Sequence, residues 1–363
     1  MNKLGFGFLR FPMDGDRVRY DILTPMVDAF FAAGGTYIDT AYPYLNGKSE
    51  EAVRETVVKR YPRDRYLIAN KLPGYDVKTY EDCYAYFEES LKRCGVDYFD
   101  VYMLHWLDQK HYALAEKYDE FRFLRELKAS GKAKRIGFSF HDTAELLDEI
   151  LTKHPEVDCV LLQINYLDWE SEGVQSRRCY ETAVRHGKSV IVMEPVKGGT
   201  LARVPEKAAQ ILKALDPERS PAFHALRFVQ SLPHVEVVLS GMAAVEQMEE
   251  NLLQVEPMTE QELELLRQAA EAISEATAVA CTGCGYCVKH CPKNIAIPEY
   301  FRLYNENRQM PRHAWKQKPA YHEIARERGK ASDCISCGAC EKKCPQKLPI
   351  REHLAALKEV MEG

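Results

Sequence analysis

The chain has 363 residues and a mass of 41.6 kDa, more than one hydrophobic core usually organises, so two domains are expected. Hydrophobic residues at 46% and charged residues at 28% are ordinary globular values and exclude a largely disordered or fibrous chain. The net charge of −5 gives no reason to expect nucleic acid or membrane as a partner, and neither a membrane span nor a secretory signal is visible. We therefore expect a cytoplasmic protein.

Short apolar runs alternate with amphipathic stretches from the N-terminus to residue 256. Eight runs have the composition of buried strands: 4–9, 36–39, 66–70, 99–105, 134–138, 159–164, 189–193 and 236–239. Helix-like stretches follow them: 21–33, 49–60, 79–93, 118–129, 142–152, 176–186, 220–231 and 243–253. Eight such alternations are typical of an α/β fold of the (β/α)8 TIM barrel type. An open doubly wound sheet is the alternative, but Gly5 and Gly7 lie within the first strand and lack the third glycine of a dinucleotide-binding loop.

Polar side chains follow three successive strands of the predicted barrel, where barrel enzymes build their active sites. Asp39 ends the second strand and is followed by Tyr44, Lys71 follows the third strand, and His105 ends the fourth. A tyrosine, with a pKa of about 10, is a poor acid at neutral pH, but a nearby ammonium stabilises the phenolate and an aspartate balances the ammonium. A histidine can bind the substrate oxygen. The set predicts proton delivery to a carbonyl oxygen by Tyr44, with Tyr42 as the alternative acid.

Residues 1–256 resemble the aldo-keto reductase family over the length of the barrel. The segment Ile38–Ala41, Tyr44, Lys71 and Leu104-His105 match the catalytic tetrad of that family and its usual contexts. The resemblance implies that Ser139, Gln163 and Asn165 line a nicotinamide pocket. It also implies cofactor contacts after the last two strands: Met193, Glu194, Pro195, Val196, Lys197, Gly198 and Gly199, then Ser240, Gly241, Met242, Gln247, Glu250 and Asn251 at the adenosine phosphate and adenine. Ser49 is expected to cap the second helix, with Glu50 in its first turn.

The family's usual basic residues around the 2′-phosphate of NADPH are replaced in this chain. The corresponding positions hold Gly241, Met242 and Gln247. A phosphate dianion without a cation would be poorly compensated. The sequence therefore predicts NAD(P)H as the barrel's cofactor but leaves open NADH, NADPH and a flavin, either FMN or FAD. Substrate choice would depend on the segments 107–118 and 196–220.

The motif C-x2-C-x2-C-x3-C-P occurs twice in the last 83 residues. In such runs three thiolates of one turn bind one iron–sulfur cluster, and the fourth cysteine binds the other. Zinc sites use paired cysteines rather than triplets followed by Cys-Pro, so two [4Fe–4S] clusters are predicted. The first cluster is assigned to Cys281, Cys284, Cys287 and Cys344, and the second to Cys334, Cys337, Cys340 and Cys291.

The region around the two motifs is predicted to be helical. Residues 259–277 read as a closing helix with a capping box of Thr259 and Glu262, and 298–308 and 321–329 as helices between the motifs. This organisation resembles a helical two-cluster ferredoxin. We therefore expect a barrel domain over residues 1–277 and a smaller, mainly helical ferredoxin-like domain over 278–363.

The two parts transfer electrons differently, because clusters carry single electrons whereas NAD(P)H carries a hydride. Residues 281–363 hold 15 Lys and Arg and 9 Asp and Glu, so 15 − 9 = +6, a charge suited to an acidic carrier such as ferredoxin or flavodoxin. The leading hypothesis is an oxidoreductase that reduces a carbonyl or related unsaturated compound while the clusters relay electrons. The alternatives are a nucleotide-binding redox sensor without turnover and an electron-transfer subunit of a larger complex.

Overall fold

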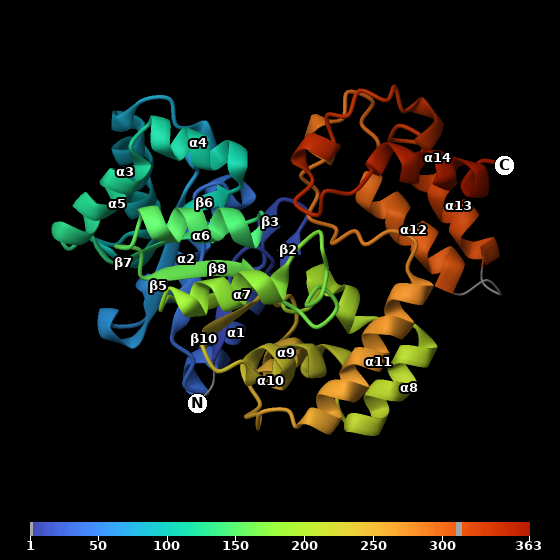
Figure 1. The fold of residues 1–363 in the computed structure, drawn as a ribbon, viewed down its shortest axis with the longest axis horizontal. Helices are drawn as coiled ribbons and strands as arrows, with labels where there is room; N and C mark the ends of the chain where they lie inside the picture. The colour runs from blue at the N-terminus through green and yellow to red at the C-terminus, as the bar shows by residue number, and fades with distance from the viewer. Residues whose placement is uncertain (1–2, 310–313) are drawn as a thin grey trace. The chain divides into compact units, whose positions relative to one another are not determined.

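The computed structural model describes residues 3–309 and 314–363 (Figure 1). The chain divides into two compact units: unit 1 comprises residues 1–195 and 225–258, and unit 2 comprises 196–224 and 259–363. Unit 2 thus contains residues 196–224 and 259–277, which the sequence analysis places in the barrel domain. Within the described ranges, no helix is long and apolar enough to cross a membrane.

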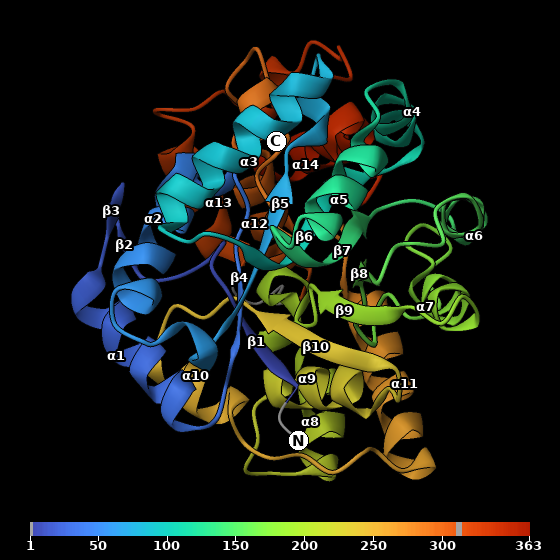
Figure 2. The same cartoon turned by 90° about the vertical axis from the view of Figure 1, so that its left-hand side faces the viewer.

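Unit 1 is built on a closed barrel of eight parallel strands, as the sequence predicts. Around the barrel the order is β1, β10, β9, β8, β7, β6, β5 and β4, and β1 closes it by pairing with both β4 and β10 (Figure 2). The strands are β1 (Leu4–Gly7), β4 (Tyr37–Asp39), β5 (Leu67–Leu72), β6 (Phe99–Leu107), β7 (Ala133–Phe140), β8 (Cys159–Gln163), β9 (Ser189–Met193) and β10 (Val235–Ser240). Each lies on one of the eight predicted apolar runs.

The interior of the barrel is filled by side chains rather than being open. A buried cluster there includes Tyr37, Met103, Leu161 and Ile191. Parallel pairing in register places Asp39 beside Ala69, and Lys71 beside Met103. Since all strands run in one direction, their carboxyl ends meet at one edge, and the polar residues that follow the strands gather there.

The predicted helices of unit 1 are present, and most differ only by small shifts at their ends. The exception is the helix predicted over 49–60, which is an α-helix only as far as Val53 and continues as a π-helix over Arg54–Val58. The helices are α1 (Tyr20–Ala32), α2 (Lys48–Val53), α3 (Tyr80–Cys94), α5 (Glu120–Ala129), α6 (Ala144–Lys153), α7 (Ser176–Arg185) and α10 (Val245–Asn251), while α9 (Pro221–Ser231) begins in unit 2. α3 shows why these boundaries are readable: Thr79 and Asp82 form a capping box, and Gly95, with a φ of 71°, ends the helix in the left-handed conformation.

Three elements of the barrel region differ from expectation. A short hairpin, β2 (Met13–Asp14) and β3 (Arg17–Val18), lies between β1 and α1. The segments 107–118 and 196–220, expected as substrate loops, contain helices α4 (Gln109–Lys117) and α8 (Glu206–Leu215). α4 forms because Asp108 accepts a hydrogen bond from the backbone N–H of His111 at 2.8 Å and so caps its first turn.

Unit 2 is helical, as expected for its cysteine-rich part. It contains α8, α11 (Glu260–Ala276), α12 (Ile297–Gln309), α13 (Ala314–Ile324) and α14 (Ile350–Met361), and Figure 1 shows the last three side by side. The capping box of Thr259 and Glu262 at α11 is confirmed. The helix predicted over 321–329 is wrong in its bounds: α13 ends at Ile324, since the following turns lead to a β-bridge between Gly329 and Ile295.

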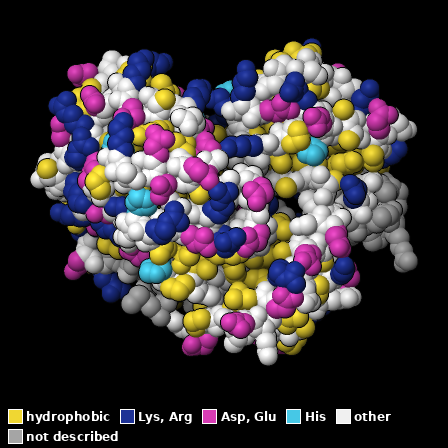
Figure 3. All heavy atoms as spheres, in the orientation of Figure 1, with side chains coloured by type: hydrophobic (Ala, Val, Ile, Leu, Met, Phe, Trp, Pro, Cys, Tyr) yellow, Lys and Arg dark blue, Asp and Glu magenta, His cyan; other side chains and the backbone are white. Residues whose placement is uncertain are grey.

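α14 is a helix that was not predicted from the sequence. Its buried residues are Ile350, Leu354, Leu357 and Met361, which recur at helical spacing and join the core beneath the cysteine motifs. Lys and Arg side chains are interspersed with Asp and Glu on the face shown in Figure 3.

Candidate functional site

The carboxyl edge of the barrel brings together the four residues predicted to be catalytic. The Nζ of Lys71 donates to both carboxylate oxygens of Asp39, at 2.8 and 2.7 Å, and to the backbone oxygen of Thr40 at 2.7 Å. The same Nζ lies 4.9 Å from the ring centroid of Tyr44, and the Tyr44 ring lies 5.6 Å from that of His105. Residues from three strand ends therefore surround one tyrosine.

The turn that carries Tyr44 has an unusual backbone. Tyr44 begins a short 3-10 segment in which Leu45 and Asn46 have φ angles of 51° and 55°, and Gly47 has a φ of 88°. Left-handed conformation is costly for a branched residue such as leucine, by about 1–2 kcal/mol. The surrounding structure holds this turn, which leads directly from Tyr44 into α2.

Tyr42, the alternative acid, points to a different set of partners. Its ring packs under the guanidinium of Arg93 at 4.3 Å, and its hydroxyl accepts a hydrogen bond from Arg93 at 3.3 Å. The ring also makes an edge contact with Tyr86. Tyr44, not Tyr42, is the tyrosine that faces Lys71 and His105.

Burial controls the electrostatics of this site. It lowers the pKa of Lys71 and raises the pKa of Asp39, while the ion pair between them acts in the opposite direction on each. Burial, with a contribution from the charge of Lys71, holds the pKa of His105 well below 6.5. His105 is therefore a neutral imidazole at pH 7, and its Nδ1 is buried with no hydrogen-bond partner.

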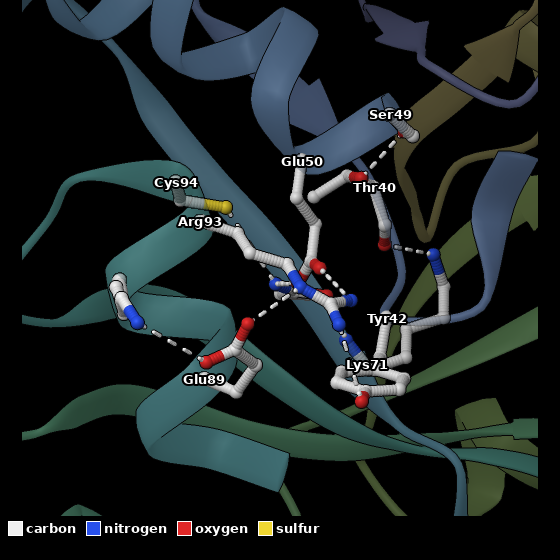
Figure 4. Close-up of polar contacts among 10 residues, drawn as sticks. Thr40, Tyr42, Ser49, Glu50, Lys71, Glu89, Arg93 and Cys94 are labelled. Carbon is white, nitrogen blue, oxygen red and sulfur yellow. Dashed lines mark hydrogen bonds and ion pairs between the residues drawn. The ribbon is translucent and has the colours of Figure 1, made fainter. Parts of the chain in front are cut away.

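A hydrogen-bond and ion-pair network that was not predicted from the sequence holds the backbone of Lys71 (Figure 4). The Asn70 side chain accepts from the backbone N–H of Lys71 at 2.7 Å and donates to the fully buried carboxylate of Glu50 at 2.8 Å. Arg93 pairs with the other oxygen of Glu50 at 3.2 Å. Glu50 is thus a buried ionic partner rather than only a first-turn acid.

The expected capping role of Ser49 is wrong. α2 begins at Lys48, and the Ser49 hydroxyl donates instead to the backbone oxygen of Phe8 at 2.6 Å. Ser49 also lies 2.6 Å from the hydroxyl of Thr40, next to Asp39. It joins the ends of two strands to α2.

The residues expected around the nicotinamide lie at the ends of β7 and β8. The Ser139 hydroxyl accepts from the backbone N–H of Trp106 at 2.7 Å. The side-chain amides of Gln163 and Asn165 both donate to one oxygen of Asp168, at 3.0 and 2.9 Å. Asp168 is buried and was not identified from the sequence, although it lies only three residues after Asn165. It fixes both amides.

The segment expected to cover the cofactor is divided between the units. Met193, Glu194 and Pro195 belong to unit 1, and the backbone oxygen of Glu194 accepts from Asn165 at 3.2 Å. Val196, Lys197 and Gly199 belong to unit 2. The side chain of Lys197 is fully buried there, so it presents no ammonium to solvent.

The residues expected at the adenosine end lie on the β10 end and α10. Asn251 donates to the Ser240 hydroxyl at 3.2 Å, and Gln247 accepts from the backbone N–H of Ala243 at 2.9 Å. Met242 is buried. Two further residues of this set are Gly241, which follows β10, and Glu250, within α10.

The structure places Arg10, which was not predicted from the sequence, with the base of its side chain beside Gly241. A Cβ atom built on Gly241 would lie 3.0 Å from the Cβ of Arg10, and the Arg10 guanidinium lies 3.9 Å from the carboxylate of Glu194. Arg10 follows β1, which pairs with β10 at the closure of the barrel. The predicted closure of the barrel could have indicated this contact, because it makes the ends of the first and last strands neighbours.

Two hollows in the described part of unit 2 are each surrounded by four cysteines drawn from both motifs. The first hollow is lined by Cys281, Cys284, Cys287 and Cys344, and the second by Cys291, Cys334, Cys337 and Cys340. In the described part of the chain, no three His, Cys, Asp or Glu side chains converge on a point that one metal ion would occupy. The cysteines surround cavities, an arrangement that fits cubane clusters and their crosswise ligation.

The four remaining cysteines, Cys83, Cys94, Cys159 and Cys179, are buried and unpaired in disulfides. Burial raises the pKa of the Cys83 and Cys159 thiols to about 12, so they remain protonated at neutral pH. They behave as core residues.

Comparison with known proteins supports both parts. Residues 280–348 match the 4Fe-4S dicluster domain, and residues 3–271 match the aldo/keto reductase family. A relative described as 9,11-endoperoxide prostaglandin H2 reductase, from Trypanosoma cruzi, is 28% identical over 200 residues, 54% of this chain and 64% of the relative. Glyoxal reductase of Bacillus subtilis is 35% identical over 130 residues, 35% of this chain and 44% of the relative. This chain thus covers less than two thirds of either relative.

Solved structures share the fold of the barrel. The holo form of an aldo-keto reductase from Bacillus halodurans is 23% identical, with a TM-score of 0.60 over 74% of this chain and 92% of that one. An aldo/keto reductase from Klebsiella pneumoniae in complex with NADP and acetate is 21% identical, with a TM-score of 0.61 over 73% of this chain and 90% of that one. The chain belongs to the aldo/keto reductase family and carries a C-terminal 4Fe-4S dicluster domain.

Proposed function

We propose that the protein reduces a carbonyl or related unsaturated compound with NAD(P)H, and that its C-terminal domain holds two [4Fe–4S] clusters that exchange electrons with a carrier protein. The observation that carries the first part is the position of Lys71, whose buried ammonium pairs with Asp39 and faces the ring of Tyr44. The name of the Bacillus subtilis relative, glyoxal reductase, points to the same class of substrate.

Tyr44 is the proton donor of this reaction. When bound, NAD(P)H would supply a hydride to the carbonyl carbon. As negative charge develops on the carbonyl oxygen, the Tyr44 hydroxyl transfers its proton there, and the Lys71 ammonium stabilises the phenolate left on Tyr44. Neutral His105 donates an N–H to the same oxygen and orients the substrate. One C–H and one O–H bond form, and the product is an alcohol.

The nucleotide would lie on residues of both the β7–β8 and β10 ends. Ser139, Gln163 and Asn165 would hold the nicotinamide, with Asp168 fixing the two amides. Arg10 would supply the cation that Gly241 and its neighbours lack. The NADP in the Klebsiella structure favours a nicotinamide nucleotide, and a flavin, the alternative from sequence, has no support among the relatives.

Cysteines of the two hollows would bind the clusters in the crosswise arrangement. When bound, such clusters supply one-electron transfer. The positive charge of residues 281–363 favours an acidic carrier of the ferredoxin or flavodoxin type as the partner.

The test uses the full chain purified without oxygen. Iron, sulfide, flavin and nucleotide contents are measured first, and NADPH and NADH oxidation is then followed with a panel of aldehydes, ketones and activated alkenes. Tyr44→Phe should lower kcat by roughly 100-fold or more with little change in nucleotide affinity, because a positioned acid contributes about 10²–10⁴. Tyr42→Phe is the matched control and should retain turnover.

Two results would redirect the proposal. Equal loss of turnover in both tyrosine variants would remove Tyr44 as the acid. Nucleotide binding without turnover of any carbonyl would favour the redox sensor, and co-purification of a flavoprotein would favour a subunit of a larger complex.

A further inference from the structure

Lys197 places a buried positive charge next to the first hollow. It begins the 3-10 segment Lys197–Ala202 in unit 2, and its side chain is only 1% exposed. Its Nζ lies 3.4 Å from the side-chain oxygen of Gln346, a residue that lines the first hollow together with Cys281 and Cys344. An ammonium removed from water is stabilised by nearby negative charge. Thiolate-ligated iron–sulfur clusters carry such charge.

A glycine sets how closely this segment approaches the cysteine motif. Gly198 has a φ of 63°, and a Cβ atom on it would overlap the carbonyl oxygen of Thr282, which lies between Cys281 and Cys284. Gly199 has a φ of 96°, but a Cβ atom there would meet nothing within 4 Å. Both positions favour glycine for their backbone, and only Gly198 needs it for packing against the motif.

A second group acts at the same hollow as Lys197. The backbone N–H of Gly283 donates to the Sγ of Cys281 at 3.4 Å. The ammonium beside Gln346 and this N–H both favour negative charge at the edge of the first hollow that Cys281 and Gln346 line. The second hollow differs, since its lining residue Arg351 is paired with Glu341 at 2.9 Å and Lys293 is exposed.

We propose that Lys197 is a positioning residue for electron transfer, whose buried charge raises the reduction potential of the cluster held by Cys281, Cys284, Cys287 and Cys344. The inference rests on the proposed cluster assignment. Reduction adds one electron from a one-electron carrier to this cluster and no bond is made or broken. The added negative charge interacts favourably with the fixed ammonium, so the reduced form is stabilised relative to the oxidised form.

The experiment is a redox titration of the anaerobically purified full chain with mediator dyes and dithionite, followed by EPR, on Lys197→Met, Lys197→Arg and Lys293→Met. Iron and sulfide are measured on each variant. Lys197→Met should reduce the equilibrium constant for reduction of one cluster by on the order of tenfold. That is a fall of about 59 mV for one electron. Lys197→Arg should restore the potential, and Lys293→Met should leave this cluster unchanged because its charge is exposed.

A second pair of variants covers the case in which Lys197→Met does not load iron. Gly198→Ala should move the segment away from Thr282 and lower the same potential, whereas Gly199→Ala should not. The inference would be overturned if iron-loaded Lys197→Met had the same reduction potentials as the wild type, or if the two alanine variants had equal potentials. Either result would leave the proposed function unaffected. A wild-type chain that binds no iron and sulfide would instead overturn the proposed function.

Discussion

Glu120 is a buried acid whose ionisation should weaken the folded barrel unit. It is the first residue of α5, its side chain is 1% exposed, and its Oε1 is buried without a hydrogen-bond partner. The carboxyl group lies against Gly74, where a Cβ atom would overlap its Oε2. Burial raises the pKa of Glu120 from 4.5 to about 8. The ring centroid of Tyr75, the residue after Gly74, lies 6.0 Å from that of His105. Glu120 therefore contacts the segment that packs against the candidate site.

The magnitude follows from the difference in pKa between the folded and unfolded chain. Each pH unit between the two values changes the free energy of unfolding by about 1.4 kcal/mol. The folded state binds the proton more tightly, so its stability relative to the unfolded state is greatest below pH 4.5 and is lost as pH rises to about 8. Between pH 5 and pH 8 the wild type should lose about 3 to 4 kcal/mol through this one group.

The assay compares urea unfolding of the wild type and Glu120→Gln from pH 5 to pH 8, followed by tryptophan fluorescence and far-UV circular dichroism. The amide cannot ionise, so the free energy of unfolding of the variant should rise steadily with pH relative to that of the wild type. A packing cost that does not depend on pH does not affect this trend. Glu126→Gln on the same helix is the control. Hydrogen bonds from Tyr80, Tyr84 and Arg122 lower the pKa of Glu126 to about 2, so its contribution is lost only in acid and is constant in this range. A difference between wild type and Glu120→Gln that does not change with pH would refute the reasoning.

Three further substitutions test the site. Asp39→Asn should lower kcat roughly 100-fold or more and move the alkaline limb of the pH–rate profile to lower pH. The reason is that the buried Lys71 ammonium loses its counter-ion and gives up its proton more easily. An unchanged alkaline limb would contradict this role of Asp39. Arg10→Met should raise the KM for NADPH by about tenfold and the KM for NADH much less, since it removes the proposed cation of a side chain that begins beside Gly241. Equal effects on both nucleotides would show that Arg10 does not contact the 2′-phosphate. Asp168→Asn should weaken nucleotide binding measured by fluorescence quenching, because one carboxylate oxygen accepts from both Gln163 and Asn165. Full affinity would show that the two amides keep their positions without the carboxylate.

The strands of the barrel were predictable because each is a short apolar run that is buried on both faces. β9, for example, has the predicted bounds of Ser189–Met193. The hairpin β2–β3 escaped prediction because two-residue strands leave no periodicity to read. α14, in contrast, carries a full helical repeat of buried residues, so its signal is present in the sequence.

The meeting of the four proposed catalytic residues was predictable from position, since Asp39, Lys71 and His105 each lie at a strand end and parallel strands end at one edge. Glu50 and Arg10 were not, because their roles depend on contacts between segments distant in the sequence. Glu50 meets Arg93, 43 residues away, and Arg10 meets Gly241 only through the closure of the barrel. Motif spacing specifies which chemistry is present, whereas burial and long-range contacts decide which partner each charge has.

Lys71 illustrates why the burial matters to the chemistry. An ammonium has three N–H donors, and in this site Asp39 accepts through both oxygens and the backbone oxygen of Thr40 accepts as well. The charge is therefore held in one position with no water needed to solvate it, and at 4.9 Å from the Tyr44 ring its field is screened far less than it would be in solvent. A lysine at the same place on an exposed loop would have the same sequence signature and little effect on the tyrosine. The proposed catalytic use of Tyr44 thus depends on the buried acceptors around Lys71 as much as on the lysine itself.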